Sequence, residues 1–402
     1  MSPLRWYQRR GAWRSAAYPT LLLPSGHQVG RVRALHWLLV ATCVPLDVLR
    51  NFVTGRWGRR PPTSILFVTR AHLGDFLMTI PCLMLARKTL ANARLTTVVQ
   101  PRYLDQVDYS DIVDVATPEP DEKLPFLAQL TFWLRRFREK GYDAVVFHRI
   151  TRADFPAIVA AFLVGIPYRV GGADKGTSGL LTDLYSPKSR EHIVDYHLNL
   201  VRCWLELGPE DGAKVWPRVV GDTGASVPGY DIVIAPFAQH TKIWSIEAWH
   251  QLLSQLVGRG LRIALSATPA FARQSAEILE RFPQVDNLSE TTGTLRDLFA
   301  TVRRARLLIA VDTGIRHVAA AVGTPCVTLG QGREHLTIQG PYVTTERYLI
   351  HPVPCAPCGA EPCPLGHLQC VRGITVAEVL QAIDDLATKF SIFAEKQKFP
   401  ER

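Results

Sequence analysis

A strand–turn–helix pattern runs twice along this chain of 402 residues, and no other feature constrains its fold as strongly. In the first series, which starts at residue 63, short apolar runs such as Ser64–Thr69 and Ala144–Phe147 are typical of parallel strands buried on both faces. Helical patterns such as Phe126–Lys140 lie between these runs. Alternation of this kind predicts an α/β domain built on a doubly wound parallel sheet.

The second series begins at residue 230, with strand candidates at Ile232–Ala235, Leu307–Val311 and Cys326–Leu329. Residues 208–229 separate the two series and contain five Gly, three Pro and two Asp with little periodicity, which favours a linker. We therefore predict two Rossmann-like domains that face each other across a cleft. The predicted division is an N-terminal extension (1–62), a first domain (63–210), a linker (211–229), a second domain (230–375), and a C-terminal helix and tail (376–402).

Doubly wound sheets bind ligands beyond the carboxyl ends of their strands, so the loops that follow strands are the candidate sites. The first such loop ends at Asp75 and includes His72 and Gly74, whose lack of a side chain permits a tight turn. Asp75 has two interpretations. It caps the following helix by accepting from backbone N–H groups, or it removes a proton from an attacking hydroxyl. The residues of this loop leave both open.

The second loop, Pro236–Ser245, leads from a predicted strand into a predicted helix. A helix N-terminus favours anions, and Lys242, next to Thr241, adds a positive charge, so this loop suits a diphosphate. The alternative is a surface lysine near Trp244, a tryptophan of the core.

The third loop, Asp312–His317, follows a strongly apolar strand candidate. Thr313 and Gly314 are small enough for a ligand to approach the backbone, and Asp312 can accept hydrogen bonds from sugar hydroxyls. His317 falls in the first turn of the next predicted helix, where it can contact phosphate. A structural histidine is the alternative at this position.

Four passages, taken in order, resemble the ADP-heptose:lipopolysaccharide heptosyltransferases of glycosyltransferase family 9. They are VTRAHLGDFLMTIP (68–81), TKIWSIEAWHQL (241–252), LLIAVDTGIRHVAAAVGTPCVTLG (307–330) and CAPCGAEPCPLGHLQC (355–370). The D-T-G-x-x-H-x-A-A-A-x-G-T-P stretch is the most specific of them. The resemblance spans about residues 63–385 and leaves residues 1–62 unmatched.

The resemblance implies an α/β protein of the GT-B fold, with an acceptor domain at 63–210 and a donor-nucleotide domain at 230–375. It also implies an inverting, metal-independent transfer without a cofactor, from a nucleotide sugar such as ADP-heptose to a lipid-linked acceptor such as a lipopolysaccharide core. By position, Asp75 matches the catalytic base, and His72 and Gly74 lie in its acceptor-side loop. The donor-binding positions are Thr241, Lys242, Asp312, Thr313, Gly314 and His317.

Two segments depart from the family pattern. Ser266–Ala270 replaces a Gly-rich, acid-containing turn, and Gln331–His335 follows Gly330 without the expected small-residue turn. These departures leave the nucleotide base and the sugar open. The alternatives are a family relative that uses another nucleotide sugar, and a non-catalytic relative that only binds one.

The N-terminal extension carries almost all of the net charge of +10. Residues 1–62 hold ten Arg, no Lys and a single acid, Asp47, whereas the rest of the chain has 36 Lys and Arg against 35 Asp and Glu. The apolar run Ala34–Leu46 is shorter than the ~20 residues that span a bilayer. Arg, Trp and a short apolar run favour an anionic membrane surface as partner, and hence a cytoplasmic protein peripheral to the inner face of the cytoplasmic membrane.

A disordered or core-docked extension is the alternative to this membrane role. Nucleic acid is disfavoured as a partner because the body of the chain is nearly neutral and carries no nucleic-acid-binding motif. The oligomeric state is left open.

Eight cysteines fall into two groups. Four lie close together near the C-terminus, with a spacing that suits a structural zinc ion less well than two C-x-x-C pairs would, so reduced thiols or a disulfide are the favoured alternatives. These are Cys355, Cys358, Cys363 and Cys370. The other four lie in apolar contexts and are predicted to be buried, reduced thiols. These are Cys43, Cys82, Cys203 and Cys326.

Overall fold

The structure is a computed structural model. It describes residues 60–393 except 70–72, 102–103, 105–111, 122, 149–151, 173–178, 188–190, 209–228, 239–242, 290–294, 333–335, 344, 359–362 and 364, and it also describes Thr42, Leu46 and Leu49. The predicted extension and linker therefore lie almost wholly outside the described residues.

The chain divides into two compact units. The first unit comprises residues 1–71, 79–104 and 109–215, and the second comprises residues 72–78, 105–108 and 216–402. Helix α3 spans Leu73–Thr89. The beginning of α3 therefore belongs to the second unit, and the rest of the helix belongs to the first.

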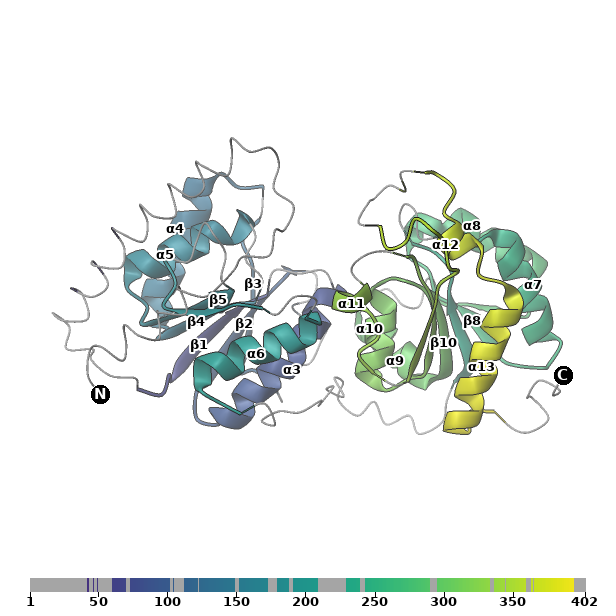
Figure 1. The fold of residues 1–402 in the computed structure, drawn as a ribbon, viewed down its shortest axis with the longest axis horizontal. Helices are drawn as coiled ribbons and strands as arrows, with labels where there is room; N and C mark the ends of the chain where they lie inside the picture. The colour runs from purple at the N-terminus through teal and green to yellow at the C-terminus, as the bar shows by residue number, and fades with distance from the viewer. Residues whose placement is uncertain are drawn as a thin grey trace. The chain divides into compact units, whose positions relative to one another are not determined.

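The first unit contains a parallel sheet of six strands in the order β3-β2-β1-β4-β5-β6 (Figure 1). Its strands are β1 (Ser64–Val68), β2 (Arg94–Val99), β3 (Val115–Pro118), β4 (Ala144–Phe147), β5 (Tyr168–Gly172) and β6 (Asp183–Tyr185). Besides α3, its helices are α4 (Phe126–Lys140), the 3-10 turn η3 (Arg152–Asp154), α5 (Phe155–Val164) and α6 (Ile193–Leu205).

Helices cover both faces of this sheet. On one face, Trp133 and Phe137 of α4 stack with ring centroids 5.5 Å apart and pack in one cluster with Leu66 of β1. Helices α3 and α6 lie on the opposite face (Figure 1). Because the central strand is covered twice, residues 65–68 are at most 2% exposed, as the continuous apolar run predicts.

The second unit contains another parallel sheet of six strands, in the order β12-β11-β10-β7-β8-β9. Its strands are β7 (Tyr230–Ala235), β8 (Ile263–Leu265), β9 (Asp286–Asn287), β10 (Ala305–Val311), β11 (Cys326–Leu329) and β12 (Glu346–Leu349). Its helical segments are α7 (Ile246–Val257), η4 (Pro269–Phe271), α8 (Ala272–Arg281), α9 (Leu295–Arg304), α10 (Gly314–Val322), α11 (Leu336–Gln339), α12 (Gln369–Arg372) and α13 (Val376–Phe390).

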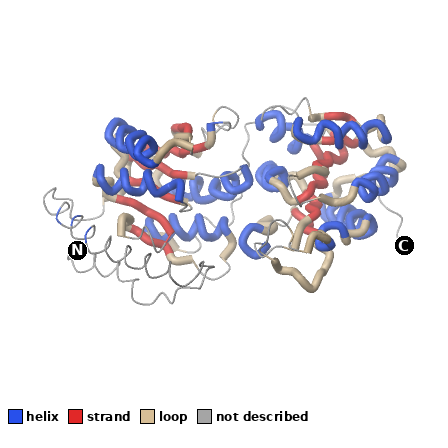
Figure 2. The backbone as a smooth tube through the Cα atoms, turned by 90° about the horizontal axis from the view of Figure 1, so that it is seen from above, coloured by secondary structure: helices blue, strands red, loops and turns tan. Residues whose placement is uncertain are grey.

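Strands in this unit also lie between helices, as Figure 2 shows for both units. Helices α7 and α13 cover one face, where Trp249 and Leu386 are almost fully buried in the main core cluster. Trp244 belongs to this core, as the sequence indicates, and its Nε1 donates to the Ile374 carbonyl at 2.8 Å. Helices α9 and α10 lie on the other face (Figure 1).

Both sheets have the same topology when their strands are numbered in chain order. Each sheet reads 3-2-1-4-5-6. The order in which strands are added therefore reverses between β1 and β4 in the first sheet and between β7 and β10 in the second. Ligands of doubly wound folds bind beyond the carboxyl ends of strands at such a reversal point. The three predicted loops follow β1, β7 and β10, which are strands of these two reversal points. The predicted α/β fold class is confirmed.

Candidate functional site

The turn that opens helix α10 lies at the carboxyl end of the central strand β10. Asp312 follows the strand, and its backbone N–H donates to the Leu329 carbonyl at 3.0 Å. Thr313 is the N-cap residue, yet its side chain does not cap the helix, since its hydroxyl donates to the Val311 carbonyl at 3.3 Å. Since the Thr313 side chain leaves the first-turn amides uncapped, these amides and the helix dipole favour an anion at this turn.

Helices α7 and α13 of the same unit have N-termini that a side chain caps. Ser245 caps α7 by accepting from the backbone N–H of Ala248 at 3.1 Å. Thr375 and Glu378 form a reciprocal capping box at α13. At α7 and α13 a side chain therefore occupies first-turn amides, whereas the Thr313 side chain leaves those of α10 available to a ligand.

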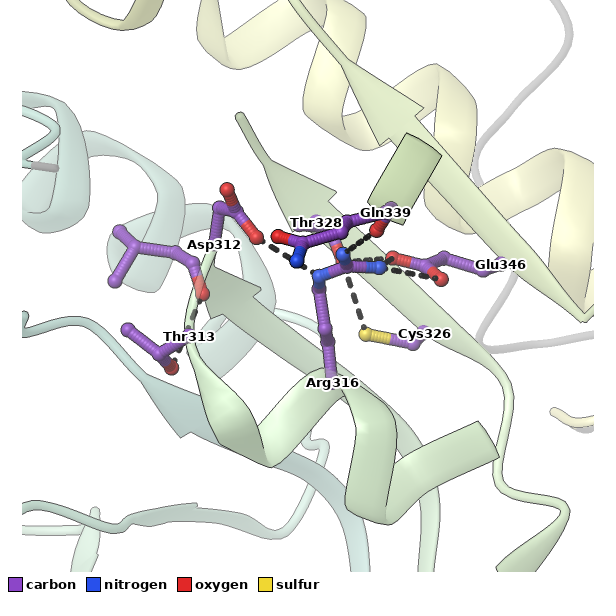
Figure 3. A network of polar contacts seen from close by, with 8 residues as sticks. Asp312, Thr313, Arg316, Cys326, Thr328, Gln339 and Glu346 are labelled. Atoms are coloured by element: carbon purple, nitrogen blue, oxygen red, sulfur yellow. Dashed lines mark hydrogen bonds and ion pairs between the residues drawn. The ribbon is translucent and has the colours of Figure 1, made fainter. Parts of the chain in front are cut away.

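Arg316, the third residue of α10, lies beneath this turn and is 4% exposed. Its Nε donates to Asp312 Oδ1 at 2.8 Å, and its Nη1 donates to Glu346 Oε1 at 3.3 Å. Its Nη2 donates to the backbone carbonyl of Gln339 (Figure 3). Burial alone would lower the pKa of Arg316, but the charges of Glu346 and Asp312 outweigh it and raise that pKa.

Glu346, the first residue of β12, supplies the second buried carboxylate of this network. It is 8% exposed and accepts from the Thr328 hydroxyl at 2.7 Å, and Cys326 Sγ lies 3.4 Å from the same hydroxyl (Figure 3). Burial raises the pKa of Glu346, against the opposing effect of the Arg316 charge. Parallel pairing places Cys326 opposite Glu346, which brings this carboxylate to the face of the sheet that carries α10.

Tyr348 closes the network from the next same-face position of β12. Burial, followed by the charge of Asp312, raises the pKa of the Tyr348 hydroxyl, which forms a side-chain hydrogen bond with Asp312. The guanidinium carbon of Arg316 lies 5.5 Å from the centroid of the Tyr348 ring. A Cβ on Gly330 would lie 1.9 Å from that ring, so only glycine fits at the end of β11.

Residues 73–78, the described part of the α3 turn assigned to the second unit, approach the α10 turn. A Cβ on Gly74 would lie 2.7 Å from His317 Cδ2, and a Cβ on Gly314 would lie 3.7 Å from the Gly74 nitrogen. Gln339 Nε2 donates to Asp75 Oδ1 at 3.4 Å. Asp75 is the third residue of α3 and is half-buried, so it lies in the first turn of the helix and not at its N-cap position.

The carboxyl end of β4, in the first unit, carries a different group of side chains. His148 directly follows the strand and is 2% exposed. Its Nδ1 lies 3.5 Å from Cys82 Sγ, and its ring meets that of His197 edge-on, with centroids 5.1 Å apart. Burial, and then the neighbouring His197, hold the pKa of His148 well below its usual range. Burial raises the pKa of the Cys82 thiol.

A match to a protein family identifies the class of protein that contains these turns. A family model described as glycosyltransferase family 9 (heptosyltransferase) matches residues 134–369, more than half of the chain. The chain belongs to glycosyltransferase family 9. The matched range includes the whole α10 turn and the Arg316 network, whereas Asp75 lies outside it.

Relatives and solved structures agree with this assignment. Lipopolysaccharide heptosyltransferase 1 of Escherichia coli O18:K1:H7 is 24% identical over 284 residues, which cover 66% of this chain and 85% of that protein. The structure of E. coli ADP-heptose lps heptosyltransferase II matches with a TM-score of 0.65 and 19% identity, over 82% of this chain and 100% of that one. E. coli heptosyltransferase WaaC with ADP-2-deoxy-2-fluoro heptose matches with a TM-score of 0.64 and 18% identity, over 80% and 99%. This family-9 protein is thus a glycosyltransferase with the GT-B fold.

The structure describes some of the predicted site residues of this glycosyltransferase and not others. The second unit brings together Gly74, Gly314 and His317, and Asp312 lies at the start of the same turn. His72, Thr241 and Lys242 lie outside the described residues. The roles assigned to all of these residues stay predictions.

The four C-terminal cysteines are half-buried, free thiols, and Cys355 Sγ lies 3.8 Å from His367 Nε2. Among the residues that the structure describes, no group of three or more His, Cys, Asp or Glu side chains could hold a metal ion. Cys82 and Cys326 are buried as predicted, but Cys203 is exposed, so that part of the prediction is wrong. Cys203 lies on α6 but is not among the residues, such as Val201 and Trp204, that this helix buries.

Sequence reasoning assigned no role to Arg316, Glu346, Tyr348 or His148. Asp312 and Arg316 are four residues apart across a helix start, a spacing at which an acid and a base can pair, and this signal was available. His148 directly follows a predicted strand, which was a second available signal. Glu346 and Tyr348 carried none, because β12 was not predicted and only its pairing with β11 brings them to the site.

Proposed function

We propose that this glycosyltransferase transfers heptose, or a similar sugar, from a nucleotide-sugar donor such as ADP-heptose to a lipopolysaccharide-core acceptor or another lipid-linked glycan. The family match over residues 134–369 carries the proposal, because it contains the complete Asp312–His317 turn. The similarity to lipopolysaccharide heptosyltransferase 1 and to ADP-heptose lps heptosyltransferase II supports a heptose donor and a lipopolysaccharide acceptor.

The proposed reaction is a single, inverting displacement. Asp75 takes the proton of the acceptor hydroxyl, whose oxygen attacks the anomeric carbon of the donor. As this new bond forms, the bond between the anomeric carbon and the diphosphate oxygen breaks, and the nucleoside diphosphate leaves with the electron pair. The half-buried position of Asp75 in the first turn of α3 supports a base that the acceptor hydroxyl can reach.

The leaving diphosphate is met without a metal in this proposal. The first-turn amides of α10 are the proposed donors to it, together with Thr241 and Lys242 and with His317 in the same helical turn. Asp312, Thr313 and Gly314 contact the donor sugar. His72 and Gly74 belong to the acceptor side, where Gly74 has no room for a side chain beside His317.

An enzyme assay over a panel of donors tests this function. The purified full-length protein is incubated with a heptose-deficient lipopolysaccharide acceptor and with ADP-, UDP- or GDP-linked sugars in turn. We expect one added heptose mass on the acceptor with ADP-heptose. Transfer from another nucleotide sugar alone would favour the second candidate, a family member with a different donor, which the departures at Ser266–Ala270 and Gln331–His335 support. Binding without any transfer would identify a non-catalytic relative.

We also propose that residues 1–62 hold the enzyme at the cytoplasmic face of the membrane by contact with anionic lipid. Ten arginines against one acid support this role, as do Leu46 and Leu49, which are 54% and 58% exposed. Within the part of the chain that the structure describes, no helix is both long and apolar enough to cross a bilayer.

Vesicle sedimentation with the full-length chain tests the membrane role. We expect binding to anionic phosphatidylglycerol vesicles that is lost with neutral vesicles, and that the double change L46D and L49D weakens. Leu163→Asp is the matched control, because Leu163 is 51% exposed but lies on α5 in the folded body. Equal binding by all three proteins would exclude the proposed surface.

A further inference from the structure

Arg316 ties three separate segments of the second unit together. Each of its side-chain nitrogens has a partner: the carboxylate of Asp312 at the end of β10, the carboxylate of Glu346 at the start of β12, and the backbone carbonyl of Gln339 on α11 (Figure 3). A fork of fixed donors is what such a three-way contact requires, and lysine has no equivalent geometry.

A gain in folding stability does not explain why these three charged groups are buried together. Taking a guanidinium and two carboxylates out of water carries a large desolvation penalty, and buried ion pairs are often no more stabilising than apolar residues of the same size. Arg316 and both carboxylate side chains are at most 8% exposed. A buried ionic network at a ligand-binding turn is better explained by what it does to that turn.

Charge at the α10 turn is the first such effect. A diphosphate that approaches the first-turn amides also approaches Asp312, whose carboxylate would repel it. Arg316 Nε, 2.8 Å from Asp312 Oδ1, compensates that negative charge from below. The repulsion is removed without a cation in the path of the ligand.

Orientation is the second effect. Thr313 does not cap the helix, because its hydroxyl donates to the Val311 carbonyl instead. An Asp312 carboxylate that was not held could therefore turn toward the amides of α10 and occupy the donors that the ligand needs. Arg316 holds the carboxylate from one side, and Tyr348 bonds it from the neighbouring strand.

We propose that Arg316 is a positioning residue for the nucleotide-sugar donor: it compensates and holds Asp312 so that the α10 turn presents its amides to the diphosphate. This inference rests on the proposed function. Glu346 and the Gln339 carbonyl keep the guanidinium in place, and the Thr328 hydroxyl holds Glu346 in turn. Apart from Asp312, no part of the network needs to touch the sugar.

A comparison of two affinities, for a nucleoside diphosphate and for its nucleoside, distinguishes this positioning role from a general loss of structure. Titration calorimetry with full-length protein first selects among ADP, UDP and GDP the diphosphate that the wild type binds best. We expect Arg316→Met to lower the affinity for that diphosphate by at least about 10-fold. The affinity for the corresponding nucleoside should stay within about twofold, because only the diphosphate carries the charge. Arg316→Lys, which keeps the charge but loses the fork, should fall between the two.

Two controls are matched to Arg316. Arg306 lies in the same unit and likewise bridges a carboxylate, Asp231 at 3.5 Å, and a backbone carbonyl, that of Ile392 at 2.9 Å, so Arg306→Met should leave both affinities unchanged. Leu386→Ala removes part of the core beneath α13, on the face of the sheet opposite α10, and should lower the unfolding temperature. Its diphosphate affinity should stay that of the wild type.

A double variant makes the inference falsifiable even if the single change is poorly stable. In the chain that carries both D312N and R316M, no carboxylate remains at the turn to be compensated, so diphosphate affinity should return to within about threefold of the wild type. A double variant as weak as Arg316→Met, or an equal loss for diphosphate and nucleoside, would overturn the inference. A wild type that binds none of the three diphosphates would overturn the proposed function, and the inference with it.

Discussion

The carboxyl ends of β4 and β10 occupy equivalent places in two sheets of identical strand order, yet their chemistry is opposite. The end of β4 is a neutral cluster, in which a buried histidine is kept uncharged beside a thiol and a second histidine. The end of β10 is an ionic network, in which a buried arginine joins two carboxylates. The difference teaches that topology determines where a ligand-facing turn lies, whereas its charge depends on side chains that the topology leaves open.

The largest expected effect separates the proposed base, Asp75 on α3, from Asp312 at the end of β10. We expect Asp75→Ala to lower turnover by at least ~10²-fold, the range of general base catalysis, with nearly unchanged donor binding. Asp312→Asn should act mainly on donor binding, because its carboxylate belongs to the α10 turn. Steady-state kinetics and donor titration measure the two effects. Unchanged turnover in Asp75→Ala would remove this carboxylate from the mechanism.

Acid should act with opposite sign on the two strand ends. Because burial lowers the pKa of His148, the unfolded chain binds protons below about pH 6.5 that the folded chain does not, so this contribution to stability is lost as pH falls. Because burial raises the pKa of Glu346, its contribution is instead lost as pH rises through the folded value. The slope is at most about 1.4 kcal/mol per pH unit for each group.

Hydrogen exchange between pH 7.5 and pH 5.5 can follow β4 and β10 separately. We expect protection of β4 to fall on acidification in the wild type and to become flatter in His148→Leu. His250→Leu, a change on α7 of the second unit, is the control and should keep the wild-type profile. The same slope in all three proteins would mean that the neutral cluster does not govern the acid response of this sheet.

The smallest expected effect contrasts two helix starts in the second unit. Thr375→Ala removes the capping box of α13 and should cost about 1 kcal/mol in the free energy of unfolding. Thr313→Ala should cost clearly less, because the Thr313 side chain does not cap α10. Urea unfolding measures both. Equal losses would mean that α10 starts like any structural helix, which would weaken its role as the diphosphate site.

Local patterns were sufficient for the elements that carry most of the apolar core. Helix α4 and strands β4 and β11 begin and end at the predicted residues. The two strands are continuous apolar runs, and α4 ends at Gly141, which lies in the left-handed region. Such signals lie within a few residues of the element itself.

Strands at the outer parts of both sheets were not predicted. Strand β5 contains two glycines and Arg169, which is 2% exposed because its guanidinium donates to the carbonyls of Leu180 and Ile166. Strand β9 has two residues, and β12 starts with a buried glutamate. These segments are strands because a neighbour pairs with them, and pairing is a property of the whole sheet.

The sequence by itself determined the two α/β series, the loops that follow their central strands, and the family to which those loops belong. Each depends on residues adjacent in the chain. Only the tertiary structure decided that Arg316 meets Glu346, thirty residues further on, because that contact requires the parallel register of β11 and β12. It also decided that His148 is buried against His197, because this contact requires α6 to pack against the sheet. Charge at a turn depends on which distant side chains fold beneath it, and no local pattern records that.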